Sequence, residues 1–454
     1  MASPRFPNIP GVDVEIQDGN LKIPRPTRGP VVVLLGKTTS TQVRADGIRY
    51  AEPFEPYGLG IDPLDVANRF KNDDGTYSEV SKAILESYAA GAKDVVAVNI
   101  EASGISTDQQ RYDALQEAYY NLQNFESIDI VVPVGTTIDA SGLDSDKNFG
   151  YQLANFCYQV TRNNNEAIGI LGTAPANTSG TPSLSDTNFW VNRLSSFDGV
   201  LSIYDGVTDV NVDDIPENYE FYGSNDEDHA SLLNPTPVVR ASAAQDQDGT
   251  PIDVGMYISV CAMDVNMYNA AAPRNPGFYT GNGASAYAGM VAALPSQEAP
   301  TNKIIAGVTI QKPLSKPQLQ KLNRSRFVCL EQKDKGLVVS NAMTGAFNVN
   351  YYSRSDFVNL TSVRIVYDAL ELIRKVGDPF VGGPNNAARR NALDSAIDSA
   401  LGSMVVAGAV QNYNYSIQST PIDQILGYIN VNLEIVPAFE VKKINVIVGL
   451  RASL

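Results

Sequence analysis

Predicted strands and helices alternate along the first third of the chain, and this order constrains the fold more than any other feature. Runs of apolar residues predict strands at 31–35, 94–100, 128–134 and 167–172. Helical patterns lie between them, at 78–90, from about 107 to 122, and at 149–160. Such alternation predicts an α/β fold with a largely parallel sheet and helices packed on it.

Each helical pattern gathers its apolar residues on one face. The first helix is expected to stop at Gly91, since glycine commonly terminates helices. The residues predicted to face the core are Val80, Ile84 and Tyr88 in the first helix, Leu115, Ala118, Tyr119 and Leu122 in the second, and Phe149, Leu153, Phe156 and Val160 in the third.

Beyond residue 176 the residue composition of the chain changes. From about 177 to 250 it is rich in Ser, Thr, Asn, Pro and Asp, which predicts a loop-rich, acidic, outward-facing insertion. Two amphipathic helices are predicted further on, one over 361–376 with Val363, Val366, Leu370 and Ile373 inward, and one with Leu393, Ile397, Leu401 and Met404 inward. The chain is therefore α+β overall, with predicted domains at 1–28 (extended arm), 29–250 (α/β, with the insertion), 251–428 (C-terminal core) and 429–454 (terminal strands and arm).

Strand-forming segments without an evident partner lie at both ends of the chain. Near the C-terminus, apolar residues alternate with polar ones at Ile429, Val431, Leu433 and Ile435, and again at Ile444, Val446, Val448 and Leu450. Near the N-terminus, a proline-rich segment contains one short alternating run with Val12, Val14 and Ile16. An unpaired apolar strand is an aggregation hazard, so we expect a partner strand from this chain or from a neighbouring one.

Composition excludes several classes of protein. Fifty acidic residues against 34 basic ones give a net charge of −16, which argues against a nucleic-acid binder. No signal-like apolar segment opens the chain, and no run reaches the roughly 18 apolar residues that span a bilayer, so we expect a cytosol-like compartment and no membrane insertion. Cys157, Cys261 and Cys329 are odd in number and far apart, which predicts buried thiols rather than disulfides or zinc ligands.

Two motifs resemble phosphate and calcium sites but lack a required residue. Gly36, Lys37 and Thr38 match the end of a phosphate-binding loop, yet the position of its first glycine is occupied by Val31. The run 144–150 has the spacing of calcium ligands but carries a phenylalanine where the loop needs glycine. We interpret the first as a strand exit and the second as the start of a helix.

A third motif and the single histidine are the remaining candidates for a binding or catalytic site. The segment GNGASAYAG at 281–289 resembles a dinucleotide fingerprint, but no strand is predicted before it, and close backbone packing is the simpler interpretation. His229 lies in the acidic insertion, and no Ser-His-Asp or Cys-His arrangement is predicted outside it. The sequence predicts no catalytic residue, no cofactor and no metal.

One stretch of the chain is locally basic. Seven basic residues and two acidic ones lie between positions 312 and 335. A solvated helix surface is the simplest interpretation, and a docking face for an acidic partner or a sister subunit is the alternative. The candidate docking residues are Lys312, Lys316, Lys321 and Arg324.

The order of several segments resembles the contractile-tail sheath proteins of myophages and related injection systems. An arm, IPGVDVEI, precedes a strand ending in glycine, VVVLLGK. The later segments follow in the order GASAYAGMVAALPSQEAPTNKIIAGV, LNRSRFVCLEQKDKGLVV, TSVRIVYDALELI, GSMVVAGAV and INVNLEIVPAFEVKKINVIVGL. The resemblance covers the arm and roughly the last 200 residues, with Asp13 standing where the family often has an aromatic residue.

This resemblance implies a structural protein rather than an enzyme. Its subunits would stack as six-fold rings in a helical lattice around an inner tail tube, with terminal arms completing a small sheet on each neighbour. The strands on either side of Pro437, with Ile429, Val431, Leu433 and Ile435 before it and Ile444–Leu450 after it, would form the edge of that inter-subunit sheet and its donated extension. Val12, Val14 and Ile16 would supply another neighbour's strand, and the basic stretch would face the tube or a subunit seam. Contraction would be a rearrangement of rigid bodies that requires no cofactor or nucleotide hydrolysis.

The resemblance also implies partners and a location. The expected partners are copies of the chain itself, the tail tube protein, and the baseplate and tail terminator proteins, with no direct contact to nucleic acid. The expected location is the tail of a virion assembled in the host cytoplasm, where contraction drives the tube through the host envelope. Three alternatives remain: the sheath of a phage-derived injection system, a static tube-forming protein, and an α/β nucleotide-dependent enzyme.

Overall fold

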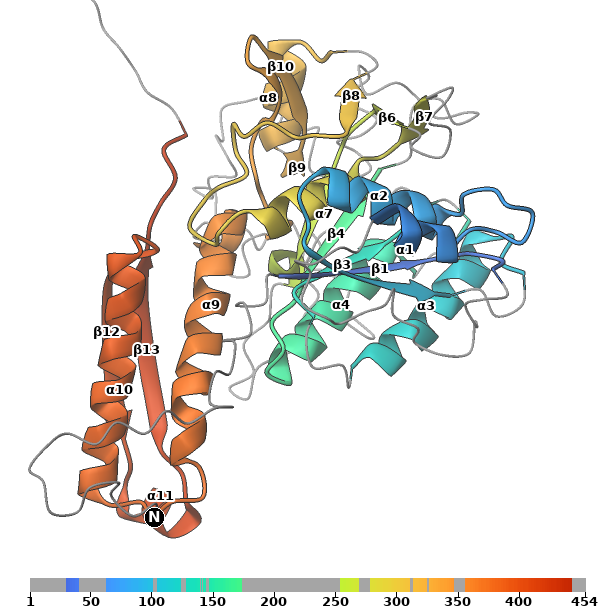
Figure 1. Cartoon of the computed structure of the whole chain (residues 1–454). Coiled ribbons are helices and arrows are strands. Elements are labelled where there is room, and N and C mark those ends of the chain that lie inside the picture. The colour runs from blue at the N-terminus through green and yellow to red at the C-terminus, as the bar shows by residue number, and fades with distance from the viewer. Residues whose placement is uncertain are drawn as a thin grey trace, which may run out of the picture.

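The computed structural model describes residues 30–40, 63–100, 104–123, 128–138, 140, 142–143, 147–173, 254–268, 278–310, 313–324, 326–346 and 356–442. A parallel sheet covered by helices and a group of short antiparallel strands together form what we call the body (Figure 1). An elongated region of helices and two strands, residues 360–437, lies beside the body, and we call it the lobe.

The body is built on a six-stranded sheet in the order β2-β1-β3-β4-β5-β9, with every pairing parallel. The inner strand β1 is buried at all six positions, as expected when helices cover both faces of a parallel sheet. Its strands are β1 (Val31–Gly36), β2 (Asp94–Asn99), β3 (Ile130–Pro133), β4 (Ile168–Gly172), β5 (Ile258–Cys261) and β9 (Phe327–Val328).

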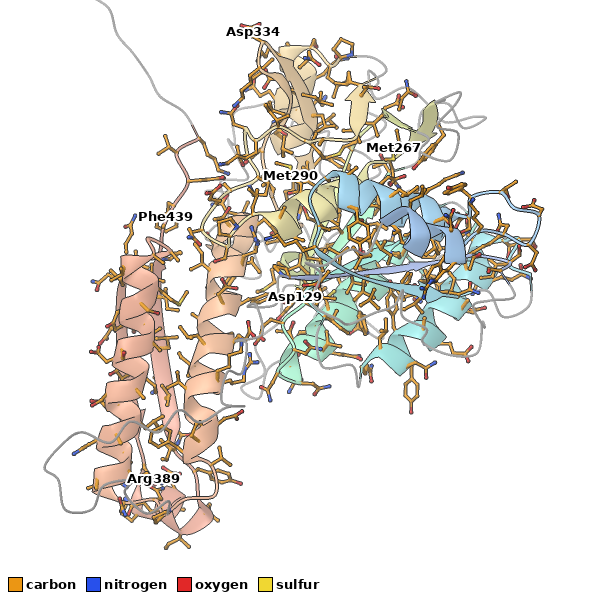
Figure 2. All side chains as sticks on the ribbon, viewed as in Figure 1. Asp129, Met267, Met290, Asp334, Arg389 and Phe439 are labelled. Carbon is orange, nitrogen blue, oxygen red and sulfur yellow. The ribbon has the colours of Figure 1, made fainter. Side chains whose placement is uncertain are left out.

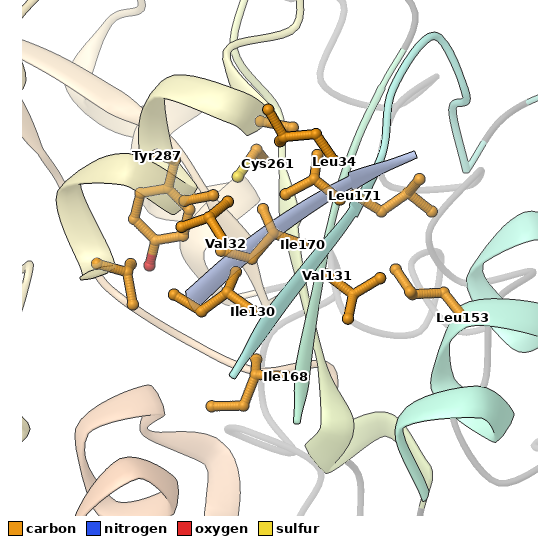
Figure 3. Packing of buried hydrophobic residues seen from close by; sticks show 14 of the residues in the cluster. Val32, Leu34, Ile130, Val131, Leu153, Ile168, Ile170, Leu171, Cys261 and Tyr287 are labelled. Atoms are coloured by element: carbon orange, nitrogen blue, oxygen red, sulfur yellow. The ribbon is translucent and has the colours of Figure 1, made fainter. Parts of the chain in front are cut away.

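Helices cover this sheet from both sides (Figure 1). On one side lie α1 (Pro63–Arg69), α2 (Glu79–Ala89) and α7 (Ala284–Ala293), and on the other lie α3 (Asp108–Leu122) and α4 (Phe149–Arg162). α2 and α7 approach closely because Gly289 has no side chain. A Cβ atom there would lie 2.2 Å from the carbonyl oxygen of Ser87. Figure 3 shows the resulting core, with Tyr287 of α7 on one side of the strands and Leu153 of α4 on the other.

Short antiparallel strands and one helix extend the body beyond the parallel sheet. A three-stranded sheet has the order β7-β6-β8, and β10 pairs with β11 as a hairpin. These elements are β6 (Val265–Tyr268), β7 (Phe278–Gly281), β8 (Val308–Ile310), α8 (Lys316–Arg324), β10 (Leu330–Lys333) and β11 (Gly336–Val339). Two short 3-10 helices, η3 (Val254–Tyr257) and η4 (Asp356–Val358), also belong to the body.

The lobe has a hydrophobic core of its own, separate from that of the body. Ile365, Ile397 and Leu401 are fully buried in it, and one face of the sheet β12–β13 packs against it. The elements of the lobe are α9 (Leu360–Gly377), η5 (Asp378–Phe380), α10 (Ala387–Val406), β12 (Val410–Gln418), α11 (Pro421–Leu426) and β13 (Asn430–Pro437).

The predicted α/β order of the first third of the chain is confirmed. The helices begin where capping residues are found, with Ser78 accepting a hydrogen bond from Ser81 and Thr107 forming a capping box with Gln110. The three cysteines are buried, as predicted. None of the helices in the described part of the chain is both long enough and apolar enough to cross a bilayer.

Two predictions about local structure are wrong. Leu370 does not face inward but is 39% exposed, because α9 has two apolar faces: Val363 and Tyr367 belong to the core of the body, and Ile365 to that of the lobe. A strand, β7, does precede the segment 281–289, although its proline- and glycine-containing flank predicted none. β7 lies in the antiparallel sheet, so the strand-turn-helix unit of a dinucleotide site is still not formed there.

The structure places two strands from beyond residue 250, β5 and β9, in the same sheet as β1–β4. Likewise, β13 pairs with a strand that precedes residue 428. The domain limits proposed above remain predictions.

Candidate assembly interface

The lobe presents a two-stranded antiparallel sheet at the side of two long helices (Figure 1). β13 runs against β12 from Asn430, opposite Gln418, to Pro437, opposite Val410. β12 therefore supplies the partner that the sequence left open for Ile429–Ile435. Within the described residues, β12 and β13 pair only with each other, so both outer edges of this sheet carry backbone groups without a partner strand.

The two faces of the sheet differ in polarity. Ile429, Val431, Leu433 and Ile435, predicted from their alternation, pack against the core of the lobe. From β12, Tyr413, Tyr415 and Ile417 pack on the same side. The opposite face is exposed and is polar except for Val436 at its end. Across it the side-chain amide of Asn414 donates a hydrogen bond of 3.1 Å to Glu434.

The hydroxyl groups of two tyrosines on β12 form hydrogen bonds with residues of α10. The hydroxyl of Tyr413 donates to the Asp398 carboxylate at 2.8 Å, and that of Tyr415 donates to the backbone carbonyl of Asp394 at 3.0 Å. Loss of solvation on burial, together with hydrogen bonding to the Asp394 side chain, raises the pKa of Tyr415 to about 12. The sequence prediction missed β12 because most of its residues are Asn, Gln and Ser. The alternation of Tyr413, Tyr415 and Ile417 is the signal that identifies it.

The other predicted strand residues lie outside the described part of the chain. These are Val12, Val14 and Ile16 near the N-terminus and Ile444, Val446, Val448 and Leu450 near the C-terminus. The last described segment, 438–442, runs from β13 back to the body. There the Lys442 ammonium group donates to the side-chain oxygens of Asn341 and Asn359, at 3.0 and 2.7 Å.

The basic stretch is only partly assembled on one surface. Lys316 forms an ion pair with Glu331 on β10, and Lys333 lies 3.6 Å from the same carboxylate. Arg326 is buried and donates inward to the carbonyl of Gly345, so it does not belong to an exposed basic face. Lys321 lies on α8, whereas Lys312 and the side chain of Arg324 lie outside the described residues.

The residues of the two ligand-like motifs bond within the fold. Lys37 donates to the carbonyl of Ile105, and the backbone N–H of Thr38 donates to the Asn99 side chain. Gly36 to Thr38 thus form a strand exit, as predicted. In the calcium-like run, Asn148 caps α4, as expected for a helix start, and 144–146 lie outside the described residues. No group of three potential metal ligands occurs among the residues that the structure describes.

A polar joint connects the lobe to the body. Arg374 of α9 forms an ion pair with Glu166 and donates to the carbonyl of Asn164, and Arg364 donates to the carbonyl of Leu294. Beside these contacts is a cleft of about 790 Å³, lined by charged residues that include Asp129, Arg364 and Asp368. Nothing in the sequence pattern indicated this joint, because its residues are far apart in the chain.

No protein-family model matches the chain, and no curated protein matches it in sequence. Solved structures match it in fold over nearly its whole length. A sheath chain of an extracellular contractile injection system in the contracted state shares 11% identity, covers 98% of this chain and 98% of its own length, and gives a TM-score of 0.57. The helical sheath of the anti-feeding prophage, also contracted, gives 13% identity, 98% and 99% coverage, and a TM-score of 0.54.

The same fold occurs in a crystal structure of a sheath tail protein from Desulfitobacterium hafniense. It shares 10% identity, covers 94% of this chain and 100% of its own, and gives a TM-score of 0.52. The chain has the contractile-sheath fold. The predicted mixed α/β fold is therefore confirmed, and it matches the folds of sheath proteins.

Proposed function

We propose that this chain is the structural subunit of a contractile sheath, polymerising as stacked six-fold rings around an inner tube. The observation that carries the proposal is the two-stranded sheet of the lobe, whose edges have no partner strand among the described residues. The likeness in fold to sheath chains over nearly the whole length supports it. Such an edge is the surface to which a strand from a neighbouring subunit adds.

The faces of the lobe sheet define which strand fits its edge. An added strand must place apolar side chains toward the helices and polar ones toward solvent, so it must alternate with a period of two. The run Val12–Ile16 has this pattern, with acidic residues between the apolar ones. In Ile444–Leu450 apolar residues recur at every second position, with Asn445, Ile447 and Gly449 between them. We therefore assign them as the exchanged terminal arms, and contraction becomes a movement of rigid bodies joined by these arms.

Lys312, Lys316, Lys321 and Arg324 are proposed to face the inner tube or a subunit seam. Of these, Lys316 has a highly exposed side chain on α8, which supports the assignment. Reversing the charge of Lys316 and Lys321 is expected to weaken docking to the tube protein in a co-sedimentation assay. Unchanged docking and assembly would rule this role out.

The remaining partners follow from the same role. A sheath of this kind would be bounded by a baseplate and by a tail terminator protein. Its place would be the tail of a virion assembled in a host cytoplasm, or a phage-derived injection device. In either case contraction would drive the tube through an envelope.

Negative-stain electron microscopy tests the sheath proposal. The full chain is compared with a chain that ends after Lys442, which retains every described element and lacks only the assigned C-terminal arm. We expect hollow tubes with six-fold end views from the full chain, and monomers from the truncated one with an unchanged unfolding curve. A chain that lacks only residues 452–454 serves as the control and should form tubes. Monodisperse full-length protein at high concentration would overturn the proposal.

A further inference from the structure

The end of the lobe farthest from the body carries an exposed apolar surface. The short helix α11 connects β12 to β13 there, and none of its residues is buried. Ile422, Ile425, Leu426 and Tyr428 are between 60% and 85% exposed, and we call these four residues the tip patch. The helix is held by a capping box between Thr420 and Asp423 and by Gly427 in the left-handed conformation, at φ 81°, rather than by packing.

The tip patch is apolar and almost free of charge. From Ser419 to Tyr428 the only charged residue is Asp423. Its carboxylate accepts hydrogen bonds from the backbone N–H and the hydroxyl of Thr420, and these bonds lower its pKa. In a chain of net charge −16, such a surface can approach another subunit without the repulsion that the acidic remainder produces.

A second apolar surface lies at the opposite end of the lobe. It consists of Val405, Val406, Val436, Phe439 and Val441, and we call it the shoulder patch. The backbone N–H of Ala438 donates to the carbonyl of Ala409 at 2.9 Å, which brings the segment after β13 beside the end of α10. Figure 2 shows Phe439 at this end and Arg389, near the tip, at the other.

These two patches contain most of the exposed large hydrophobic side chains among the described residues. Among the described residues, nine of the thirteen large hydrophobic side chains that are exposed belong to one patch or the other. Single exposed hydrophobic residues are ordinary, whereas clusters of them mark interaction surfaces.

We infer that the tip patch of one subunit packs on the shoulder patch of a second copy of this chain. The inference rests on the proposed sheath function and adds a contact distinct from strand exchange. One chain carries both halves of the contact, but it cannot bring them together, because α10 alone, with 20 residues, separates them by about 30 Å. A contact between two different patches is head-to-tail, so it propagates into rings or helical tubes, whereas a tip-to-tip contact would stop at a dimer.

Disulfide cross-linking tests which surfaces meet. The native cysteines are buried and burial raises the pKa of each thiol, so they do not compete. A chain with both Ile425→Cys and Val406→Cys is assembled, oxidised and separated on a denaturing non-reducing gel. The two sites are too far apart for an internal bridge, which needs Cα atoms within about 7 Å, so we expect a ladder of covalent multimers.

Single variants identify the pairing. A mixture of Ile425→Cys and Val406→Cys chains should give cross-linked dimers, and either chain alone should give none. Dimers from Ile425→Cys alone would show tip-to-tip packing and overturn the inference. Pairing Ile425→Cys with Tyr120→Cys, an exposed position on α3 of the body, is the control and should give no product.

An assembly measurement separates this inference from the sheath proposal. Ile425→Asp is expected to raise the minimum concentration for tube formation by about tenfold or more, since each tenfold change corresponds to about 1.4 kcal/mol. Tyr120→Asp should leave that concentration unchanged, and both variants should unfold as the unaltered chain does. If Ile425→Asp forms tubes as readily as the unaltered chain, and the cysteine variants give no cross-link, the tip contact alone is overturned. An unaltered chain that forms no tubes would overturn the sheath function and the contact with it.

Discussion

At the residue scale, the packing of α2 on α7 shows what the sequence could and could not predict. Close backbone packing was expected for the segment 281–289, and Gly289 provides it by admitting Ser87 of α2. The identity of that neighbour was not predictable, because about 200 residues separate the two helices. For the same reason, the ion pair of Arg374 with Glu166 could not be predicted from the sequence. Local features such as the helix cap at Thr107 could be predicted, because their residues are close together in the chain.

Glu86, on the α2 side that meets α7, makes the stability of the fold sensitive to pH. Loss of solvation raises its pKa from 4.5 to about 8, opposed by the positive charge of Lys82 and a hydrogen bond with Ser285. Between these two values the folded chain holds a proton that the unfolded chain releases. The contribution of this group to stability is therefore complete below about pH 4.5 and is lost as the pH rises through about 8.

We therefore expect Glu86→Gln to remove part of the stability loss on the alkaline side. Relative to the variant, the unaltered chain should lose roughly 2–4 kcal/mol of unfolding free energy between about pH 5 and pH 9. Urea unfolding followed by circular dichroism at both pH values measures the difference. Glu117→Gln, at an exposed position on α3, is the control. Parallel pH dependences in Glu86→Gln and the unaltered chain would refute the role of Glu86.

At the element scale, α9 links two hydrophobic cores. Its buried residues divide between the body, through Val363, and the lobe, through Ile365. The sequence predicted one apolar face for this helix, and Leu370 was therefore wrongly predicted to face inward. The sequence does not reveal that two separate cores, those of the body and the lobe, contact one helix. α10 contacts mainly one core, and its predicted inward residues, Leu393 to Met404, are all buried.

Separate cores predict separate opening of the two regions. Leu401→Ala removes a fully buried side chain from the lobe and should cost about 2–5 kcal/mol there. We expect faster hydrogen exchange in α10, β12 and β13, with β1 to β4 unchanged. Leu34→Ala in β1 is the matched variant for the body and should leave the lobe amides unaffected unless the whole chain unfolds. Uniform acceleration across the chain in Leu401→Ala would contradict independent opening.

At the scale of the whole molecule, the lobe and the body are joined by the first half of α9, whose Val363 and Tyr367 lie in the core of the body, and by a few polar contacts beside an open cleft. Arg374 alone provides two of them, to Glu166 and to the carbonyl of Asn164. Such contacts are weak where solvent reaches them, so those of Arg374 can be lost at little cost while the buried part of α9 still joins the lobe to the body. The sheath fold was predictable from the order of segments in the arm and roughly the last 200 residues, whereas the contacts of Arg374 depend on side chains that meet only after folding.

Removing the contacts of Arg374 should loosen the lobe against the body without unfolding it. We expect Arg374→Ala to broaden the distance distribution between a spin label on the lobe and one on the body. Lys375→Ala is the control, because the partner of Lys375 is Glu371 within the same helix. The same distribution in Arg374→Ala as in the unaltered chain would mean that other contacts fix the orientation.

The path of the chain through the lobe has a mechanical consequence. The chain enters along α9 and leaves after β13 at the same end, next to the body, and it reverses direction at α11 (Figure 1). The hydrogen bonds between β12 and β13 lie across the strands. A force that pulls on the exit alone therefore peels the pairs apart one after another, beginning at Pro437. A force applied at the far end acts along both strands, which α11 joins there, so the covalent backbones carry it. The same lobe is therefore weak against one direction of tension and strong against the other.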